Sequence, residues 1–417
     1  MTVWSVNLNP NRLDPDLDPE NLRRAAPGAF AQLEALGVGG IRVDIFWHAL
    51  QPQHGAVDLA MLRWYRDFFA EARRRGLQIY ALLYHPPRWA MQLLQDNPED
   101  FLIAWRDFCT LVAEEFGGML ALVQPWNEPN NFLAALKGDP VLFHTRKIGP
   151  VTLPVGVPWE TLTALFKITR QVMPRECKVV FNVLANLCPF IPASCGWLDW
   201  EHFADRFMAL AHPWVDVIAL DHYPDTWAPG TGPLEWDCLD LAARKAVDPA
   251  SPWHRKTVIL GEVGYSSAPN FRVGLANFFP GTRGEAPMAD WYARALPCIV
   301  DKLARFPHNQ CHWVNMYELF DPLRELTGHP ALAIENHFGL IRKDYTRKPA
   351  FDTVQAAIAG NFSTLPAPWR TREPFYWRVA RWGRRLDARL RPSPVLEKLI
   401  PQASELSPEP PYPARSS

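Results

Sequence analysis

Residues 40–84, GIRVDIFWHALQPQHGAVDLAMLRWYRDFFAEARRRGLQIYALLY, decide the fold class. They begin with an apolar, β-branched run at 40–46 and end with a similar run at 77–84, each of strand length. Between them lies a stripe of apolar residues at helical spacing: Leu62, Tyr65, Phe69 and Ala72. Gly76 then supplies a helix stop. The stretch predicts a strand, a helix and a second strand, which is the repeating unit of a parallel sheet.

The same alternation continues along the chain. Predicted strands lie at 2–8, 40–46, 77–84, 120–126, 178–184, 215–220, 257–261 and 311–317. Helical stripes separate them, for example Phe101, Trp105, Phe108 and Val112, and two later helices start near Asp290 and Pro349. Eight such units predict an α/β fold of the closed (β/α)8 type, the TIM barrel. The alternative, an open doubly wound sheet, needs a glycine-rich loop after its first strand, and this strand runs into Asn9-Pro10.

Composition narrows the class of protein. The 417 residues carry 43 Lys and Arg against 44 Asp and Glu, so no overall charge favours nucleic acid as a partner. Seven cysteines without a C-x-x-C pair predict neither a disulfide framework nor a zinc site, and we expect no metal and no cofactor. The N-terminal residues have no signal-peptide pattern, and no apolar run is long enough to span a membrane. We therefore expect a cytoplasmic location.

Active sites of such barrels lie at the carboxyl ends of the strands. Two carboxylates occupy such ends here: Glu128 in VQPWNEP (123–129), after the fourth strand, and Glu262 in ILGE (259–262), at the seventh. Glycoside hydrolysis requires two carboxyl groups, one protonated to release the leaving group and one ionised to attack. The spacing of strands and carboxylates predicts a sugar-cleaving site, with Glu128 as the acid.

The sequence resembles the clan A glycoside hydrolases, in particular families 39 and 5, from Val3 to Ala359. Five motifs carry the resemblance: GIRVD (40–44) through Trp47, YHPPRW (84–89), the Asn127-Glu128 pair, Tyr223-Pro224, and FGL (338–340) followed by KPAF (348–351). The resemblance implies a retaining β-glycosidase acting on an oligosaccharide or glycoside, with Glu128 as acid/base and Glu262 as nucleophile. It also implies that Arg42 and Tyr223 contact the nucleophile and that Asn127 binds the sugar 2-hydroxyl.

We expect further substrate-binding residues beside these, namely His222, His85, Trp89, Trp126, Trp47 and Tyr317. Two departures from the family pattern concern aromatic positions. Many relatives carry a tryptophan platform at the mouth of the eighth strand. Here Trp313 is expected to lie too deep, so the platform is either Tyr317 or absent. His222 directly precedes Tyr223, and because strand side chains alternate faces we favour Tyr223 as the partner of the nucleophile.

Alternatives remain at several positions. Arg42 could form an ion pair with Asp44 two residues away, and His85 and Trp89 could serve only to shape a loop. Glu318 and Asp321 are expected to be solvated loop carboxylates. At the level of function, the same pair of glutamates suits a transglycosidase, and a catalytically inactive sugar-binding barrel is an alternative of another class.

The domain prediction is a barrel at 1–360 and a proline-rich extension at 361–417 with a disordered end. Long loops at 130–158 and 264–287 are expected to wall the pocket. Within the extension, residues 374–391 carry Phe375, Val379, Trp382, Leu386 and Leu390 at helical spacing among arginines. This pattern predicts a basic amphipathic helix, which either contacts a membrane surface or packs its apolar stripe on the barrel.

Overall fold

The computed structural model describes residues 2–130, 144–148, 151–155, 159–185, 200–224, 226, 233–268, 284–306, 312–325 and 330–361. Nearly all of the predicted C-terminal extension, including the helix predicted at 374–391, lies outside these residues. The extension and its helix therefore stay predictions. Among the described residues, no helix is both long and apolar enough to cross a membrane.

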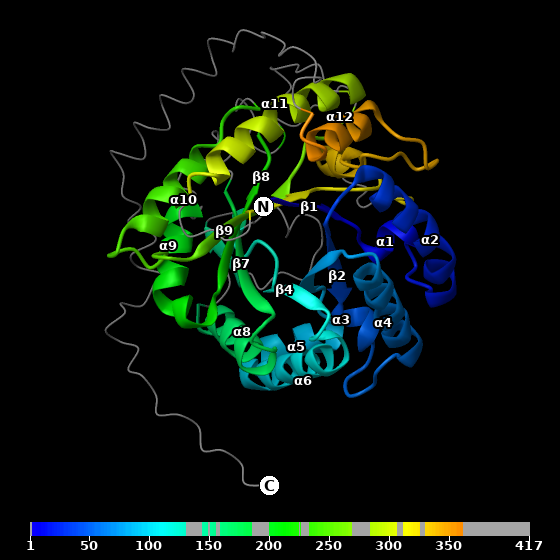
Figure 1. Cartoon of the computed structure of the whole chain (residues 1–417). Helices are drawn as coiled ribbons and strands as arrows, with labels where there is room; N and C mark the ends of the chain where they lie inside the picture. The colour runs from blue at the N-terminus through cyan, green and yellow to red at the C-terminus, as the bar shows by residue number, and fades with distance from the viewer. Residues whose placement is uncertain are drawn as a thin grey trace.

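Eight parallel strands close into a barrel, as the sequence predicts (Figure 1). The order around the ring is β1-β10-β9-β8-β7-β4-β3-β2. The strands are β1 (Thr2–Asn7), β2 (Gly40–Phe46), β3 (Gln78–Tyr84), β4 (Leu120–Pro125), β7 (Lys178–Leu184), β8 (Val217–His222), β9 (Thr257–Val263) and β10 (His312–Met316). An antiparallel pair that the sequence did not predict, β5 (His144–Ile148) and β6 (Val151–Val155), lies in the long segment after β4.

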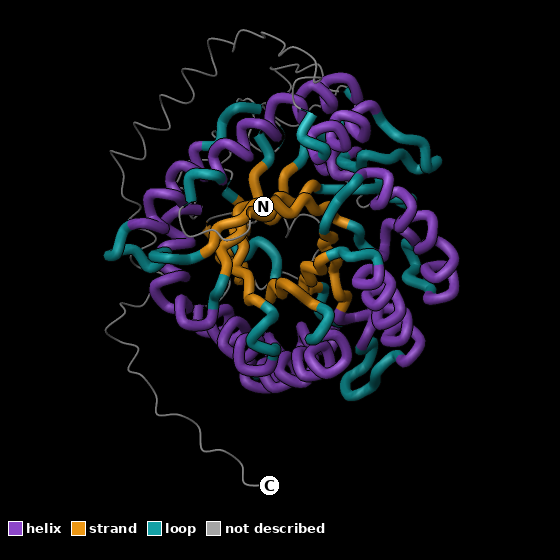
Figure 2. The backbone as a smooth tube through the Cα atoms, viewed as in Figure 1, coloured by secondary structure: helices purple, strands orange, loops and turns teal. Residues whose placement is uncertain are grey.

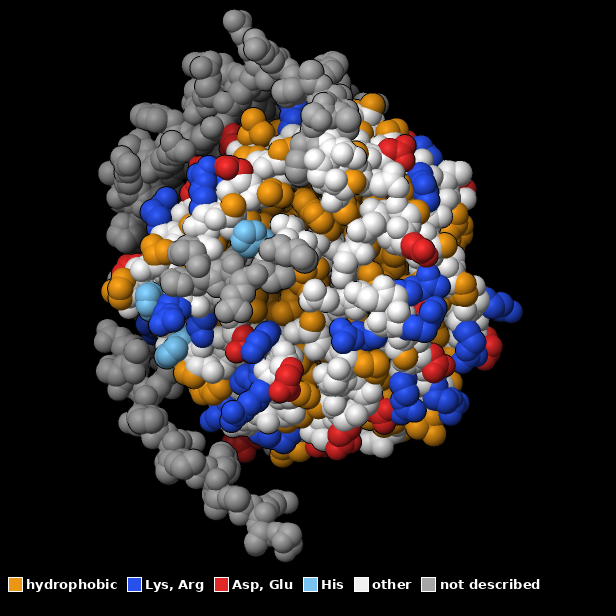
Figure 3. Space-filling view, viewed as in Figure 1, with side chains coloured by type: hydrophobic (Ala, Val, Ile, Leu, Met, Phe, Trp, Pro, Cys, Tyr) orange, Lys and Arg blue, Asp and Glu red, His pale blue; other side chains and the backbone are white. Residues whose placement is uncertain are grey.

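Helices surround the strand ring on its outer side (Figure 2). The longer ones are α2 (Pro19–Leu36), α4 (Leu59–Arg74), α5 (Arg88–Asp96), α6 (Pro98–Phe116), α8 (Trp159–Val172), α9 (Trp200–Ala211), α10 (Asp237–Val247), α11 (Glu285–Leu303) and α12 (Pro349–Ile358). Short helices are α1 (Pro10–Leu13), α3 (Trp47–Leu50) and the 3-10 turns η2 (His212–Trp214) and η4 (Pro330–His337). The space-filling view shows basic and acidic side chains interspersed over the visible face (Figure 3).

Local sequence explains where these helices begin. Asp58 precedes α4 and accepts hydrogen bonds from the backbone N–H groups of Ala60 and Met61, and Asp18 caps α2 in the same way. The predicted stripe of α4 then faces inward and is buried. Helix and strand side chains together form the main apolar core between the two layers.

The interior of the barrel divides into two parts. Its lower part is an apolar plug made of Val3, Tyr80, Leu122, Val180, Val217, Ala219, Ile259 and Trp313. Above it, towards the carboxyl ends of the strands, the buried side chains are polar: Asn7, Arg42, Gln124, Asn182, Asp221, Glu262 and Asn315. Buried polar groups are costly unless they are paired, so each of these side chains needs a partner inside the barrel.

Candidate active site

Glu262 is the centre of the polar layer. It lies on β9, is 6% exposed, and its carboxylate accepts hydrogen bonds from the Arg42 guanidinium of β2 and from the Tyr223 hydroxyl just after β8. The alternative pairing of Arg42 with Asp44 is not the one formed, since Asp44 lies 3.1 Å from His85 Nε2 instead. Two donors, one of them charged, stabilise the ionised form of Glu262.

Arg42 also connects the two predicted glutamate segments. Its Nη2 donates to Asn127 Oδ1 at 3.0 Å and to Gln124 Oε1 at 3.3 Å. Burial by itself would lower the pKa of Arg42, but the Glu262 carboxylate and other neighbouring anionic groups hold it well above its usual value. The guanidinium is therefore a permanent positive charge at the floor of the site.

Glu128 reaches the site on a segment held in an unusual conformation. Trp126 and Glu128 have positive φ angles of 74° and 37°, a region that non-glycine residues seldom occupy. Side-chain hydrogen bonds hold both: Gln124 Nε2 donates to the Trp126 carbonyl at 2.9 Å, and the Glu128 backbone N–H donates to Asn182 Oδ1 at 2.9 Å. This bend turns the chain at the end of β4, and Glu128 is 8% exposed.

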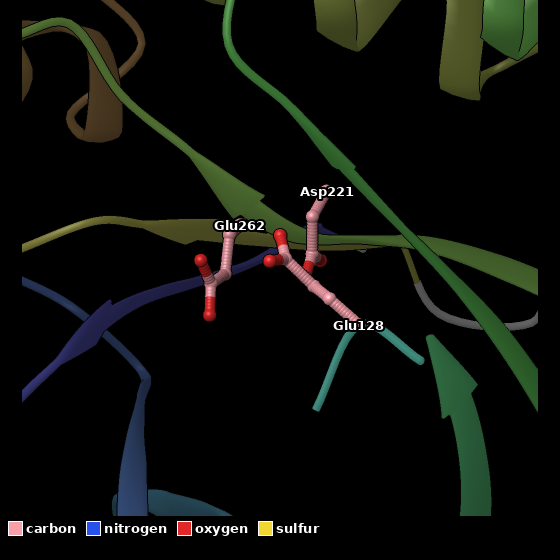
Figure 4. A group of neighbouring side chains, drawn as sticks. All are labelled: Glu128, Asp221 and Glu262. Atoms are coloured by element: carbon pink, nitrogen blue, oxygen red, sulfur yellow. The ribbon is translucent and has the colours of Figure 1, made fainter. Parts of the chain in front are cut away.

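A third carboxyl group, Asp221 of β8, joins the two glutamates. Carboxylate oxygens of Glu128, Asp221 and Glu262 all lie within 4.8 Å of one another. The three side chains converge from three different strand ends (Figure 4). Such a group of oxygens is also compatible with a cation, but here the Arg42 guanidinium already binds Glu262. Asp221 was not among the site residues predicted from the sequence.

Several predicted aromatic residues are placed away from this centre. The prediction that Trp47 binds substrate is corrected by its position. Its side chain is fully buried and stacks on Phe108 in the helix layer, with 4.9 Å between the ring centroids. Trp126 is 1% exposed and packs edge-on against Tyr84 in the same core. Neither ring is exposed to stack on a sugar, because both are buried in the main apolar core.

The prediction that His222 binds substrate is also corrected by its position. Its Nε2 donates to the Glu235 carbonyl at 2.9 Å and its ring meets Trp236 edge-on at 5.1 Å, so it faces the helix layer while Tyr223 faces Glu262. Burial lowers the pKa of His222 to about 4. The alternation of faces that favoured Tyr223 thus explains both placements.

His85, Trp89 and Tyr317 lie along the rim. His85 has a positive φ of 56° and stacks on Phe46 at 4.4 Å. Trp89 donates to the Gln51 carbonyl at 3.1 Å and stacks on His54, and it lines a surface cavity of about 450 Å³ beside the ends of β2 and β3. Tyr317, at the end of β10, is half-buried and meets the Tyr223 ring edge-on at 6.1 Å.

The wall near Tyr317 contains an ion pair that the sequence analysis missed. Arg12, just after β1, donates to Glu318 Oε2 at 2.6 Å and to the Tyr317 hydroxyl at 3.3 Å. Glu318 is fully buried, and Asp321 is bound by the Lys348 ammonium at 2.8 Å. The expectation that both carboxylates are solvated was therefore wrong, because each has a buried cation as partner.

One sequence signal could have found the missed residues. Gln124, Asn182 and Asp221 each follow apolar strand residues with a buried polar side chain on the face that points into the barrel. Asn7 and Asn315 follow the same rule on β1 and β10. A polar residue in a buried strand needs partners, and the barrel interior supplies them.

No family model matches the sequence, and no curated protein matches it. Solved structures do match. A β-glycosidase shares 13% identity at a TM-score of 0.63, covering 88% of this chain and 97% of that one. A GH5_18 protein from Streptomyces cattleya, solved in complex with Manβ1-4GlcNAc, shares 18% identity at a TM-score of 0.60, over 90% of this chain and 82% of that one. The chain has the barrel fold of glycoside hydrolases.

A third match is a family 39 glycoside hydrolase from Bacteroides cellulosilyticus, at 15% identity and a TM-score of 0.55. That match covers 87% of this chain but only 64% of the longer hydrolase. At such low identities the likeness concerns the fold, and the chemistry has to be argued from the side chains described above.

Proposed function

We propose that the chain is a retaining glycoside hydrolase that cleaves β-glycosidic bonds by double displacement. Glu128 is the acid/base and Glu262 the nucleophile. The observation that carries the proposal is the convergence of these two buried carboxyl groups, whose nearest oxygens are within 4.8 Å. Retaining glycosidases hold their carboxyl groups about 5–5.5 Å apart, whereas inverting ones need about 6.5–9.5 Å to admit a water. The short separation favours direct attack by Glu262.

In the first step, a Glu262 oxygen bonds to the anomeric carbon while the glycosidic bond breaks. The leaving oxygen takes the proton of Glu128, so an alcohol departs and an ester remains on Glu262. In the second step, the Glu128 carboxylate takes a proton from water, the water oxygen bonds to the anomeric carbon, and Glu262 leaves as a carboxylate. The sugar is released with its original configuration.

The partners of each group suit these roles. Arg42 and Tyr223 donate to Glu262, which keeps it ionised and ready to attack. Asn127 Oδ1 already accepts from Arg42, Gln124 and Asn182, so its amide Nδ2 is the part that can donate to a sugar 2-hydroxyl. The matched structures include a β-glycosidase and a family 39 glycoside hydrolase, in agreement with this class of substrate.

Hydrolysis of a panel of aryl β-glycosides tests the proposal. The wild-type chain should cleave at least one member, Glu262→Gln should cleave none, and Glu128→Ala should retain activity only on activated aryl leaving groups that need no proton. Glu285→Gln, the same kind of change in the first residue of α11, where the side chain binds Arg342, is the control and should behave as wild type.

Adding an alcohol acceptor to the same assay separates hydrolysis from transfer. A hydrolase releases mainly free sugar in moderate alcohol, while a dominant alkyl glycoside product would identify a transglycosidase. Binding of sugars by the wild-type chain without any cleavage across the panel would overturn the proposal in favour of an inactive binding barrel.

A further inference from the structure

Asp221 is a fully buried carboxyl group to which the two-glutamate mechanism gives no role. Only one of its oxygens has a hydrogen-bond partner among the described groups: Asn182 Nδ2 donates to Oδ2 at 2.6 Å, while Oδ1 is buried without a partner. A buried carboxyl group with an unmatched oxygen is costly, so its presence beside the reacting groups calls for an explanation.

The fold makes specific room for this group. A Cβ atom at Gly261, the residue before Glu262, would lie 2.5 Å from Asp221 Oδ1 and 2.9 Å from the Ala219 side chain. Gly261 does not have a positive φ, so glycine serves here to leave space rather than to permit an unusual backbone. The carboxyl group therefore occupies a fitted position between β8 and β9.

Asp221 is connected to the acid/base segment through Asn182. The Asn182 amide donates to Asp221 and, at 3.2 Å, to Asn127 Oδ1, while its carbonyl oxygen accepts the Glu128 backbone N–H at 2.9 Å. By accepting from Asn182, Asp221 fixes which way the amide points. That orientation in turn holds the Glu128 backbone, whose φ is positive, in place.

The charges around Asp221 do not allow all carboxyl groups to ionise freely. The titratable or charged groups that face it are Arg42 from β2, Tyr80 from β3, Glu128 after β4, Tyr223 after β8 and Glu262 from β9. Arg42 is the positive charge of this set, and it is bound to Glu262. Burial raises the pKa of Asp221 well above its usual range, and the Glu262 and Glu128 carboxyls raise it further.

We propose that Asp221 is a positioning residue for the acid/base step: it orients the Asn127-Glu128 segment through Asn182, and its carboxyl group shares a proton with that of Glu128. The inference rests on the proposed function. Two interacting carboxyl groups release their protons in two separated steps, and the second step belongs to the pair. Glu128 thereby holds its proton to a higher pH than a lone glutamate at this position would.

The test compares Asp221→Asn with Asp221→Ala over a range of pH, with kcat/KM measured on the best aryl glycoside. Asparagine keeps an oxygen that can accept from Asn182 but cannot titrate, so its alkaline limb should move to lower pH by about one unit. Alanine loses the hydrogen bond as well and should show the larger loss of kcat. The control is Asp216→Asn, the same change in the residue just before β8, whose side chain binds Arg170. This variant should follow the wild-type pH profile of kcat/KM.

An alkaline limb that is unmoved in Asp221→Asn would overturn the proposal. Loss of activity with a chelator and recovery with a divalent cation would also overturn it, because the three carboxyl groups would then be a cation site. The proposed function can fail separately, if the wild-type chain cleaves no glycoside. Carbon-13 NMR of the side-chain carboxyls still decides in that case: Glu128→Gln should shift the Asp221 titration, and an unchanged Asp221 titration contradicts proton sharing.

Discussion

The Arg42 guanidinium donates to the Glu262 carboxylate inside the barrel, although 220 residues separate the two in sequence. This contact joins β2 to β9 across the mouth, and through Asn127 and Gln124 it reaches the segment that carries Glu128. One cation thus positions both halves of the proposed catalytic pair.

Replacing Arg42 tests that relationship. Arg42→Lys keeps the charge but loses the fork that binds Glu262, Asn127 and Gln124 together, so kcat/KM should fall about 10- to 100-fold, as expected for one or two charge-assisted hydrogen bonds. Arg42→Met leaves Glu262 without its buried cation and should also lower the free energy of unfolding by about 3–5 kcal/mol. Steady-state kinetics and denaturant unfolding measure the two effects, and wild-type values for the methionine variant would refute this role.

Tyr223→Phe removes one hydroxyl from Glu262 without changing the packing of the ring. The nucleophile loses a donor, so kcat/KM should fall about tenfold or more while the melting temperature changes little. Tyr65→Phe is a matched control, because that hydroxyl is also buried but donates to the Asp44 carbonyl at 2.9 Å in the helix layer. The control should lower stability and leave kcat near wild type; the reverse pattern would place the functional hydroxyl elsewhere.

Asn127→Ala removes the amide expected to bind the sugar 2-hydroxyl. If that hydrogen bond strengthens in the transition state, kcat should fall by a larger factor than KM rises. Measurement of both constants on one aryl glycoside decides the point. A large rise in KM with kcat unchanged would limit Asn127 to ground-state binding.

His222 predicts a pH dependence of stability. Its pKa is about 4 in the folded chain because of burial, against 6.5 for an exposed histidine, so the unfolded chain takes up a proton that the folded one resists. The free energy of unfolding therefore keeps its full contribution from neutral, buried His222 above pH 6.5. This contribution is lost as the pH falls from 6.5 towards 4. Between pH 7 and pH 5 it amounts to about 2 kcal/mol, at about 1.4 kcal/mol per pH unit.

His222→Gln isolates this contribution, because the glutamine amide can still donate to the Glu235 carbonyl but does not titrate. Chemical unfolding of both proteins at pH 7 and pH 5 should show a smaller loss of stability in the variant. Equal losses in the two proteins would mean that folding does not lower the pKa of His222.

The barrel could be predicted from the sequence because its signal is periodic and local. Each strand is a short apolar run, and each helix carries a stripe that must be buried against it. The errors concern the end points of the strands. The sixth barrel strand lies at Val217–His222 rather than 215–220, so the predicted bounds are two residues early at both ends.

The site was less predictable than the fold. Glu128 and Glu262 stand at strand ends and could be found from their positions in the topology. Trp47 could not be placed in the same way, because the side chain of a residue one step past a strand can point into the barrel mouth or into the helix layer. In the structure it points into the helix layer, where it stacks on Phe108. Arg12 and Glu318 pair across 306 residues, a contact that exists only once the barrel has closed.

The order in which the two anomers of the product appear tests the central claim most directly. Proton NMR should follow the anomeric signals during cleavage of an aryl β-glycoside by the wild-type chain. Double displacement through Glu262 predicts that the β-anomer is released first and that the α-anomer grows in later by mutarotation. Initial release of the α-anomer would contradict the mechanism and the roles of Glu128 and Glu262.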